Sequence, residues 1–276
     1  MSIDILVCTH NRGKNLVDTL RSLKKMNGDF KVIVLDSSDE PIAKEYQKFA
    51  DRYIHLGASK KSLSSKRNMG IKMSKADFIA FTDDDCLADK NWIVELLRGM
   101  NGVECCTGKT VPYIEKKDAK FEKMFSFGKL GDKERIIKKK VIFNLFRIGH
   151  GNNMIFKRKI FDEIGLYDEN LGVGSKGLAG EDLDIFYKIL KKGYKIRYNP
   201  HAIIYHNHLV KDEEVPKTAY RNSFAAHELF LKKANLTYVI FYFLLFIKYS
   251  FKYIFGDRKV EKQRLRGILG MSYTGD

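Results

Sequence analysis

The sequence predicts an α/β protein with a Rossmann-like, mostly parallel central sheet flanked by helices. Two observations carry this prediction. In the first hundred residues, short β-branched runs alternate with segments whose apolar residues recur at helical spacing, which is typical of βαβ units. The chain also has 276 residues, of which 44% are hydrophobic, so it can bury a large core.

The predicted elements follow one another regularly along the first half of the chain. Strands are expected at 3–8, 32–36, 53–56 and 78–81, with helices between them. Thr9, Asp36 and Asp83 follow or end three of these strands. Because ligands bind outside the carboxyl ends of the strands in open α/β sheets, we expect these three residues to face one crevice.

The second half has a less regular pattern. Residues 113–140 are irregular and rich in lysine, which indicates a mobile insertion, an acceptor-facing loop or an ordinary solvated loop. Regular patterning resumes at Gly149. A helix is expected at 181–192, and further strands at 194–198 and 202–205.

The charge and the cysteines limit the partners and the compartment. The formal net charge is +16, which favours an anionic partner such as nucleic acid, acidic lipid or a phosphorylated substrate. The four cysteines form no CxxC pair and no metal-binding spacing, which fits a reduced cytosol. No secretory signal precedes the first predicted strand, so we expect a cytoplasmic protein.

An acidic run, Asp83-Asp84-Asp85, directly follows a predicted buried strand. Three crowded carboxylates repel one another unless a cation or a network of donors lies beside them. A Mg²⁺ or Mn²⁺ ion carrying a diphosphate would relieve that repulsion, since such ions prefer oxygen ligands. The alternative is a solvated acidic turn before the next helix.

Blocks of sequence around this run occur in a familiar order and spacing. They lie at 7–12, 36–38, 65–70 and 83–85, and then at 151–158, 161–169, 180–184 and 205–206. The first four resemble the nucleotide-binding half of family 2 glycosyltransferases, and the others resemble the acceptor half. The resemblance covers about residues 3–208. It implies an inverting enzyme with the GT-A fold that transfers a sugar from a nucleotide-diphosphate sugar.

The resemblance also implies roles for residues of the nucleotide-binding half. The implied nucleotide contacts are Thr9, Asn11, Arg12, Asp36, Arg67, Asp83 and Asp84. Asp85 matches the metal ligand of the family's DxD motif. His206 matches a distal histidine that joins the metal and the diphosphate, with His208 as the alternative. The implied cofactor is Mn²⁺ or Mg²⁺.

In the acceptor half, Gly151, Asn152 and Asn153 match a segment that contacts the acceptor or the donor sugar. The reaction needs a base that removes a proton from the acceptor hydroxyl. Asp182 matches the family's catalytic aspartate at the start of a helix, where backbone N–H groups keep a carboxylate ionised. Glu181 and Asp184 are its rivals. The alternative is that all three acids only complement the helix dipole.

We divide the chain into a catalytic domain at 1–231, with a nucleotide-binding half at about 1–110 and an acceptor half at about 111–231, and an extension at 232–276. The apolar run at 236–247 is shorter than the roughly 20 residues that span a bilayer, and basic residues follow it. We expect an amphipathic extension that binds an anionic membrane surface, or one that packs on the catalytic domain or a dimer partner.

The predicted partners follow from this interpretation. The donor is UDP-, GDP- or dTDP-linked, and the acceptor is a glycan or a lipid-linked glycan, as in polysaccharide biosynthesis at the inner face of the cell membrane. A nucleic-acid-binding protein is disfavoured because no recognised motif is present. A nucleotidyltransferase is disfavoured because residues 9–14 supply only one glycine for a phosphate loop. The donor sugar, the linkage and the oligomeric state stay open.

Overall fold

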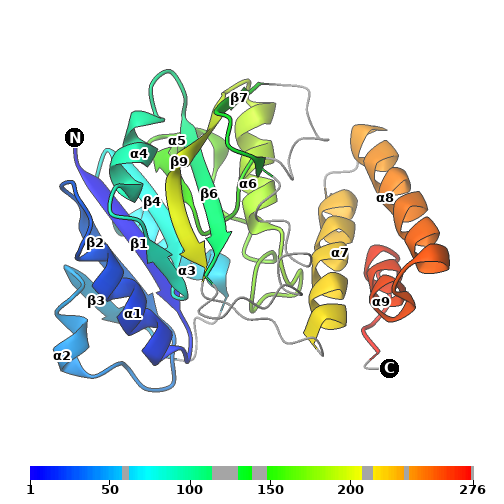
Figure 1. Ribbon diagram of the computed structural model, residues 1–276, viewed down its shortest axis with the longest axis horizontal. Coiled ribbons are helices and arrows are strands. Elements are labelled where there is room, and N and C mark those ends of the chain that lie inside the picture. The colour runs from blue at the N-terminus through cyan, green and yellow to red at the C-terminus, as the bar shows by residue number, and fades with distance from the viewer. Residues whose placement is uncertain (58–61, 114–129, 139–147, 207–213, 233–235, 275–276) are drawn as a thin grey trace. The chain divides into compact units, whose positions relative to one another are not determined.

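The structure is a computed structural model of the chain, and it describes residues 1–57, 62–113, 130–138, 148–206, 214–232 and 236–274 (Figure 1). These residues form two compact units, which are described separately. The sheet unit comprises residues 1–61, 65–166 and 185–208. The helical unit comprises residues 62–64, 167–184 and 209–276.

One half of the central sheet is parallel. It contains β1 (Ile3–Thr9), β2 (Lys31–Asp36), β3 (Arg52–His55) and β4 (Phe78–Asp83). The strands lie side by side in the order β3-β2-β1-β4, and each adjacent pair is parallel. The βαβ pattern of the sequence is therefore confirmed in this half.

The other half of the sheet is mixed. It contains β5 (Cys86–Ala88), β6 (Cys105–Pro112), β7 (Arg135–Ile137), β8 (Met154–Lys157) and β9 (Ile196–His206). The sheet continues from β4 through β8, β6 and β9 to β5, and β7 also pairs with β9. Of these pairings, β6 with β9 is parallel and the others are antiparallel. The predicted mostly parallel order thus applies to the first half of the sheet.

Two sequence-based predictions are corrected in this region. The two short strands expected at 194–198 and 202–205 are one strand, β9, because an irregularity in its pairing with β6 between Gly108 and Lys109 absorbs the break. The irregular region at 113–140 contains the strand β7, while its residues 114–129 and 139–140 lie outside the described residues.

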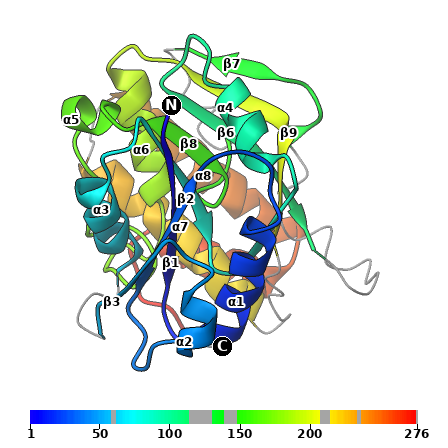
Figure 2. The same cartoon turned by 90° about the vertical axis from the view of Figure 1, so that its left-hand side faces the viewer.

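Helices cover both faces of the sheet (Figures 1 and 2). The helices of this unit are α1 (Gly13–Leu23), α2 (Lys44–Gln47), α3 (Leu63–Met73), α4 (Trp92–Arg98), α5 (Ile160–Ile164) and α6 (Glu181–Lys191), the first residues of α3 and α6 belonging to the helical unit. The helices α1 and α4 lie on one face, and α3, α5 and α6 lie on the other. Because side chains alternate along a strand, Ile5 and Val7 join the core under α1 and α4, whereas Leu6 contacts the opposite layer.

The helical unit contains α7 (Val215–Lys232), α8 (Leu236–Phe255) and α9 (Arg258–Ile268). The carboxylate of Asp257 accepts hydrogen bonds from two backbone N–H groups and caps α9. At Gly267, an added Cβ would lie 2.6 Å from the carbonyl oxygen of Tyr220, so α9 packs closely on α7. This unit groups α7 with α8 and α9, whereas the sequence suggests a domain boundary after residue 231; that boundary stays a prediction.

Among the helices of the described residues, none has the length and apolarity that crossing a membrane requires.

Candidate active site at the strand ends

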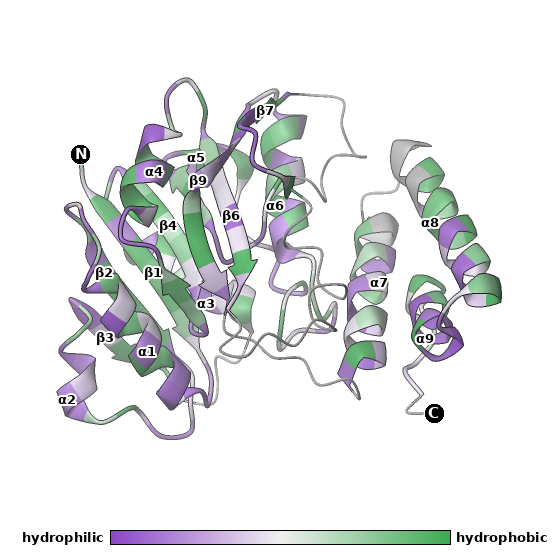
Figure 3. Ribbon diagram, viewed as in Figure 1, coloured by the Kyte–Doolittle hydropathy of each residue, from purple (hydrophilic) through white to green (hydrophobic). Residues whose placement is uncertain are grey.

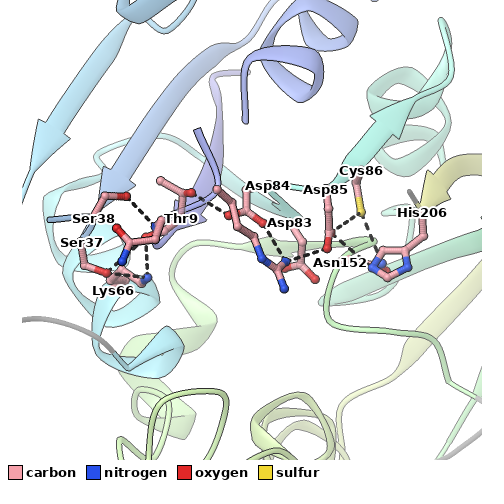
Figure 4. A network of polar contacts seen from close by, with 12 residues as sticks. Thr9, Ser37, Ser38, Lys66, Asp83, Asp84, Asp85, Cys86, Asn152 and His206 are labelled. Atoms are coloured by element: carbon pink, nitrogen blue, oxygen red, sulfur yellow. Dashed lines mark hydrogen bonds and ion pairs between the residues drawn. The ribbon is translucent and has the colours of Figure 1, made fainter. Parts of the chain in front are cut away.

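The carboxyl ends of the parallel strands lie side by side. In the strand pairing, Thr9 of β1 is opposite Asp36 of β2, and Cys8 of β1 is opposite Asp83 of β4. The residues after these strands form a polar network (Figure 4). The predicted meeting of Thr9, Asp36 and Asp83 at one edge of the sheet is therefore found.

Asp84 and Asp85 form the turn between β4 and β5. The Thr9 hydroxyl donates to Asp84 at 2.6 Å. One guanidinium nitrogen of Arg12 donates to Asp85 at 2.7 Å and to Asp84 at 3.3 Å. Burial raises the pKa of Asp84 to about 6, although Thr9 and Arg12 act in the opposite direction. Much of the carboxylate repulsion is thus balanced by Arg12.

His206 lies beside Asp85 because β5 pairs with the end of β9, which places Cys86 opposite His206. The Nε2 atom of His206 is 3.3 Å from a carboxylate oxygen of Asp85. Burial acts to lower the pKa of His206, but the hydrogen bond and charge of Asp85, together with Asp83, raise it overall. The pair therefore couples a carboxylate to an imidazole that gains a proton more readily than usual.

These residues fit a divalent ion. The ligand atoms of Asp85, Cys86 and His206 all lie within 4.8 Å of one another. Carboxylate oxygen and imidazole nitrogen are suitable ligands for Mn²⁺, and carboxylate oxygen for Mg²⁺. Burial raises the pKa of the Cys86 thiol well above its usual value, so this side chain stays protonated and donates toward Asp85 at 3.8 Å. The donor set thus fits a hard ion at Asp85 and His206 better than a thiolate-bound zinc.

Arg67 connects the acidic turn to the acceptor-half segment. Its side chain is 2% exposed, and its guanidinium lies 5.6 Å from the ring centre of Phe81. It donates to Asp83 at 3.3 Å and to the carbonyl of Gly151 at 2.9 Å. Partial burial raises the pKa of Asp83, Arg67 opposes that change and Asp85 adds to it. Arg67 is thereby held rigidly next to Asp83, whose side chain is 34% exposed.

Lys66 belongs to the same network but was not among the predicted site residues. Its buried ammonium donates to the carbonyl of Thr9 at 2.7 Å and to the Ser37 hydroxyl at 3.0 Å. Burial lowers the pKa of Lys66. Lys66 therefore connects the ends of β1 and β2 from the interior of the protein. Its position next to Arg67, in a block that resembles the family, could have indicated a place in the site. The sequence alone does not distinguish a buried, supporting lysine from an exposed one.

Asp36 and Asn11 shape the loop after β2. The buried carboxylate of Asp36 accepts a hydrogen bond from the Ser38 backbone at 2.7 Å and another from the Tyr53 hydroxyl. Asn11 has a positive φ of 55°, and its backbone N–H donates to the Ser38 hydroxyl at 2.8 Å. Both residues therefore fix the conformation of this loop, while their direct contact with a nucleotide stays a prediction.

Asn152 lies beside the acidic turn. Its amide nitrogen donates to the sulfur of Cys86 at 3.5 Å, and its oxygen accepts from the Thr110 hydroxyl at 3.0 Å. Gly151 supplies the carbonyl that accepts from Arg67. These contacts tie the predicted sugar-contacting segment to the site.

Asn153 is placed differently. Its side chain is fully buried, and both amide hydrogens are donated to backbone carbonyls, of Lys109 at 3.0 Å and of Ala202 at 2.9 Å. Its oxygen accepts from the Trp92 indole at 2.8 Å. Asn153 thus fastens β6 and β9 to α4, and the sugar contact predicted for it stays a prediction.

Glu181 and Asp182 open α6 and belong to the helical unit. The preceding Gly180 has a positive φ of 87°, and an added Cβ there would lie 3.2 Å from the Cβ of Ala225 on α7. Glycine therefore permits the turn that starts the helix close to α7. The start of α6 is fixed by this packing.

The three acids of this turn differ in burial. Asp184 is completely buried and Glu181 is 8% exposed, whereas Asp182 is partly exposed. Asp182 also accepts a hydrogen bond from the Leu183 backbone at 2.8 Å. Asp182 is therefore the most exposed of the three acids.

Sequence comparisons identify related proteins. The sequence model of the family described as Glycosyl transferase family 2 matches residues 4–165. A glucosyl-dolichyl phosphate glucuronosyltransferase of Haloferax volcanii is 26% identical over 219 residues, which are 75% of this chain and 69% of the relative. The succinoglycan biosynthesis protein ExoM of Rhizobium meliloti is 28% identical over 226 residues, 74% of this chain and 66% of the relative.

Solved structures share the fold. The crystal structure of S. aureus TarS has a TM-score of 0.57 at 16% identity, over 82% of this chain and 40% of TarS. The mannosyltransferase PcManGT of Pyrobaculum calidifontis, in complex with GDP-Man and Mn²⁺, has a TM-score of 0.57 at 14% identity, over 84% of this chain and 64% of PcManGT. The predicted family, fold class and enzyme class are thereby confirmed. Because the family model spans more than half of the chain, the protein belongs to glycosyl transferase family 2 and is a glycosyltransferase with the GT-A fold.

Proposed function

We propose that this enzyme transfers a sugar, with inversion, from a nucleotide-diphosphate sugar to a glycan or lipid-linked acceptor, with the aid of Mn²⁺ or Mg²⁺. The observation that carries the proposal is the group formed by Asp84, Asp85 and His206 at the ends of the parallel strands. This edge of an α/β sheet is where phosphorylated ligands bind. PcManGT, a structural neighbour, is described with GDP-Man and Mn²⁺.

The donor nucleotide is proposed to bind across the ends of β1, β2 and β4. Thr9, Arg12 and Asp83 lie at this edge, and Arg67 lies beside Asp83. Lys66 and Asp36 support the edge from within the protein. A rigid wall of this kind orients the ligand without a large entropy loss in the protein.

Asp85 and His206 are the residues that would hold the divalent ion. When bound, such an ion neutralises the diphosphate and stabilises it as a leaving group. Arg12 is proposed to have two roles. Its positive charge offsets the negative charges of Asp84 and Asp85, and its guanidinium binds the phosphates. The Cys86 thiol donates toward the Asp85 carboxylate, and the Asn152 amide in turn donates to the Cys86 sulfur.

Asp182 is the proposed general base. It is partly exposed at the first turn of α6. Removal of the proton from the acceptor hydroxyl makes the oxygen a stronger nucleophile toward the anomeric carbon. Gly151 and Asn152 are proposed to contact the sugar, because they contact Arg67 and Cys86 at the acidic site.

We propose that the enzyme works as a peripheral protein at the cytoplasmic face of the cell membrane, in polysaccharide biosynthesis. The names of two relatives, a dolichyl phosphate glucuronosyltransferase and a succinoglycan biosynthesis protein, support a lipid-linked or polysaccharide acceptor. The basic net charge of +16 also favours an anionic surface.

A thermal-shift screen of UDP-, GDP- and dTDP-sugars, with Mn²⁺ and with a chelator, tests the donor and the metal together. A ligand that binds only the native state raises the melting temperature, and we expect one nucleotide series to do so only with metal. If no nucleotide diphosphate sugar stabilises the protein, the donor class is wrong. Release of diphosphate from a nucleoside triphosphate and a sugar phosphate would instead identify a nucleotidyltransferase.

A further inference from the structure

The helix α8 carries a continuous exposed apolar face. Its residues recur at spacings of one, three or four, so they lie along one side of the helix. They are Ile240, Phe243, Leu244, Ile247, Phe251, Ile254 and Phe255, with exposed fractions between 38% and 80%. We call this set the α8 apolar face. Figure 3 shows the many hydrophobic residues of this helix.

The opposite side of α8 is attached to its neighbours within the helical unit. The Tyr242 hydroxyl donates to the carbonyl of Ile268 in α9 and lies 3.4 Å from Nδ1 of His227 in α7. Two helical turns later, the guanidinium of Arg264 lies 5.5 Å from the ring centre of Tyr249. These contacts set the rotation of α8, so the apolar face is turned away from α7 and α9.

Basic residues border this face on α8, and others follow it in the chain at the start of α9. Lys248 and Lys252 are exposed on α8, and Arg258, Lys259 and Lys262 are exposed on the first turns of α9. The sequence of α8 contains no acidic residue. An anionic partner therefore complements this border, whereas a second copy of the same surface would bring like charges together.

We propose that the α8 apolar face and its basic border form a docking site for an anionic lipid surface. The rings and aliphatic side chains enter the boundary between headgroups and acyl chains, and the lysines and arginines contact the headgroups. The helix lies along the membrane surface. This inference rests on the peripheral membrane location proposed above, and it names the surface of the protein that binds the membrane. It does not depend on sugar transfer, so lipid binding can be measured without substrates.

A fluorescent label on the face tests insertion directly. The four native cysteines are buried, so Phe243→Cys offers a single accessible thiol for an environment-sensitive dye. We expect a blue shift with vesicles that contain phosphatidylglycerol, and a much smaller one with phosphatidylcholine alone. The matched control is Val94→Cys on α4, where the valine is 42% exposed. No shift at residue 243, or equal shifts at both sites, would overturn the proposal.

Flotation with vesicles tests the charge. The double variant Lys248→Glu/Lys252→Glu should reduce partitioning into phosphatidylglycerol vesicles by tenfold or more, since each lysine near an anionic surface contributes roughly fivefold. Lys90→Glu, an exposed lysine before α4, should float like the unmodified protein. An equal loss of vesicle binding in both variants would mean that the overall charge, and not the basic residues beside the α8 apolar face, causes binding, which would contradict the proposal. A dye shift at residue 243 that grows with protein concentration, without vesicles, would assign the face to a second copy.

Discussion

Asp182 is the residue on which the proposed chemistry depends most directly. Asp182→Asn keeps the size and removes the basicity, so turnover should fall by roughly 10²- to 10⁴-fold at saturating donor, while donor affinity changes little. Initial rates and nucleotide titrations measure the two effects. The matched controls are Glu181→Gln and Asp184→Asn. If one of these loses turnover and Asp182→Asn does not, the base is that neighbour.

Asp85 is the residue proposed to link the metal to the donor. Asp85→Asn removes a charged ligand beside His206, so nucleotide affinity in the presence of Mn²⁺ should fall about tenfold or more. Calorimetric titrations with UDP or GDP, with Mn²⁺ and with a chelator, measure this. Asp29→Asn changes an exposed acid before β2 and should have no effect. Unchanged affinity in the Asp85 variant under both conditions would rule out its role in holding the ion.

Asp84 predicts a pH dependence of stability. Burial raises its pKa from 3.8 to about 6 in the folded chain, so the folded state binds more protons than the unfolded state between these values. The contribution of Asp84 to the free energy of unfolding therefore falls as the pH rises from about 4 to about 6. Asp84→Asn retains an acceptor for Thr9 and removes the charge. The variant should be more stable at about pH 7.5, by about 1–3 kcal/mol.

Urea unfolding at about pH 7.5 and about pH 4 checks this expectation. The advantage of Asp84→Asn should shrink to a small part of its value at the lower pH, where the carboxyl is protonated in the folded state and already partly protonated in the unfolded state. A stability gain of equal size at both pH values would mean that packing, and not charge, causes it.

At the scale of the element, α3 positions Lys66 and Arg67 by packing very closely on the sheet. A Cβ at Gly70 would lie 2.5 Å from a methyl carbon of Leu6 and 2.9 Å from one of Leu35. Gly70→Val should therefore displace α3, lower the free energy of unfolding by about 1–3 kcal/mol and weaken nucleotide binding. Denaturant unfolding and calorimetry measure both changes. Lys72→Ala, at an exposed site of α3, should alter neither, and a tolerated valine at residue 70 would contradict the tight packing.

The turn between β4 and β5 is the element that brings together the two residues proposed to hold the metal. It carries Asp85 from the end of β4 to the edge of β9, where β5 pairs antiparallel with the strand that ends in His206. A carboxylate and a histidine about 120 residues apart in the chain thus come to 3.3 Å. The short strand β5 has three residues, too few to produce a recognisable alternation in the sequence.

At the scale of the whole molecule, the net charge of +16 raises the question of nucleic-acid binding. We expect only weak, salt-sensitive retention on an oligonucleotide column, because non-specific phosphate contacts weaken steeply with salt. Elution below physiological ionic strength, and displacement by UDP or GDP with Mn²⁺, would fit a transferase. Retention at higher salt that is unaffected by nucleotide and metal would favour nucleic acid as the partner.

The sequence alone determined the parallel half of the sheet and the location of the acidic turn. Short β-branched segments that alternate with amphipathic helices can pair their backbone hydrogen-bonding groups and bury their apolar faces in few arrangements other than βαβ units. The carboxyl ends of the strands in such units lie at one edge of the sheet. The family blocks identified the enzyme class. Local spacing and matched blocks were sufficient because these features depend on neighbours in the chain.

Only the tertiary structure decided which polar residues build the site and which support it. Lys66 and Asn153 are both polar residues in matched blocks, yet one supports the strand ends and the other fastens β6 and β9 to α4. Likewise, the continuity of β9 and the exposure of one face of α8 depend on contacts between segments distant in the chain. Burial and hydrogen bonding arise from such long-range packing, which periodicity and spacing within a single sequence do not encode.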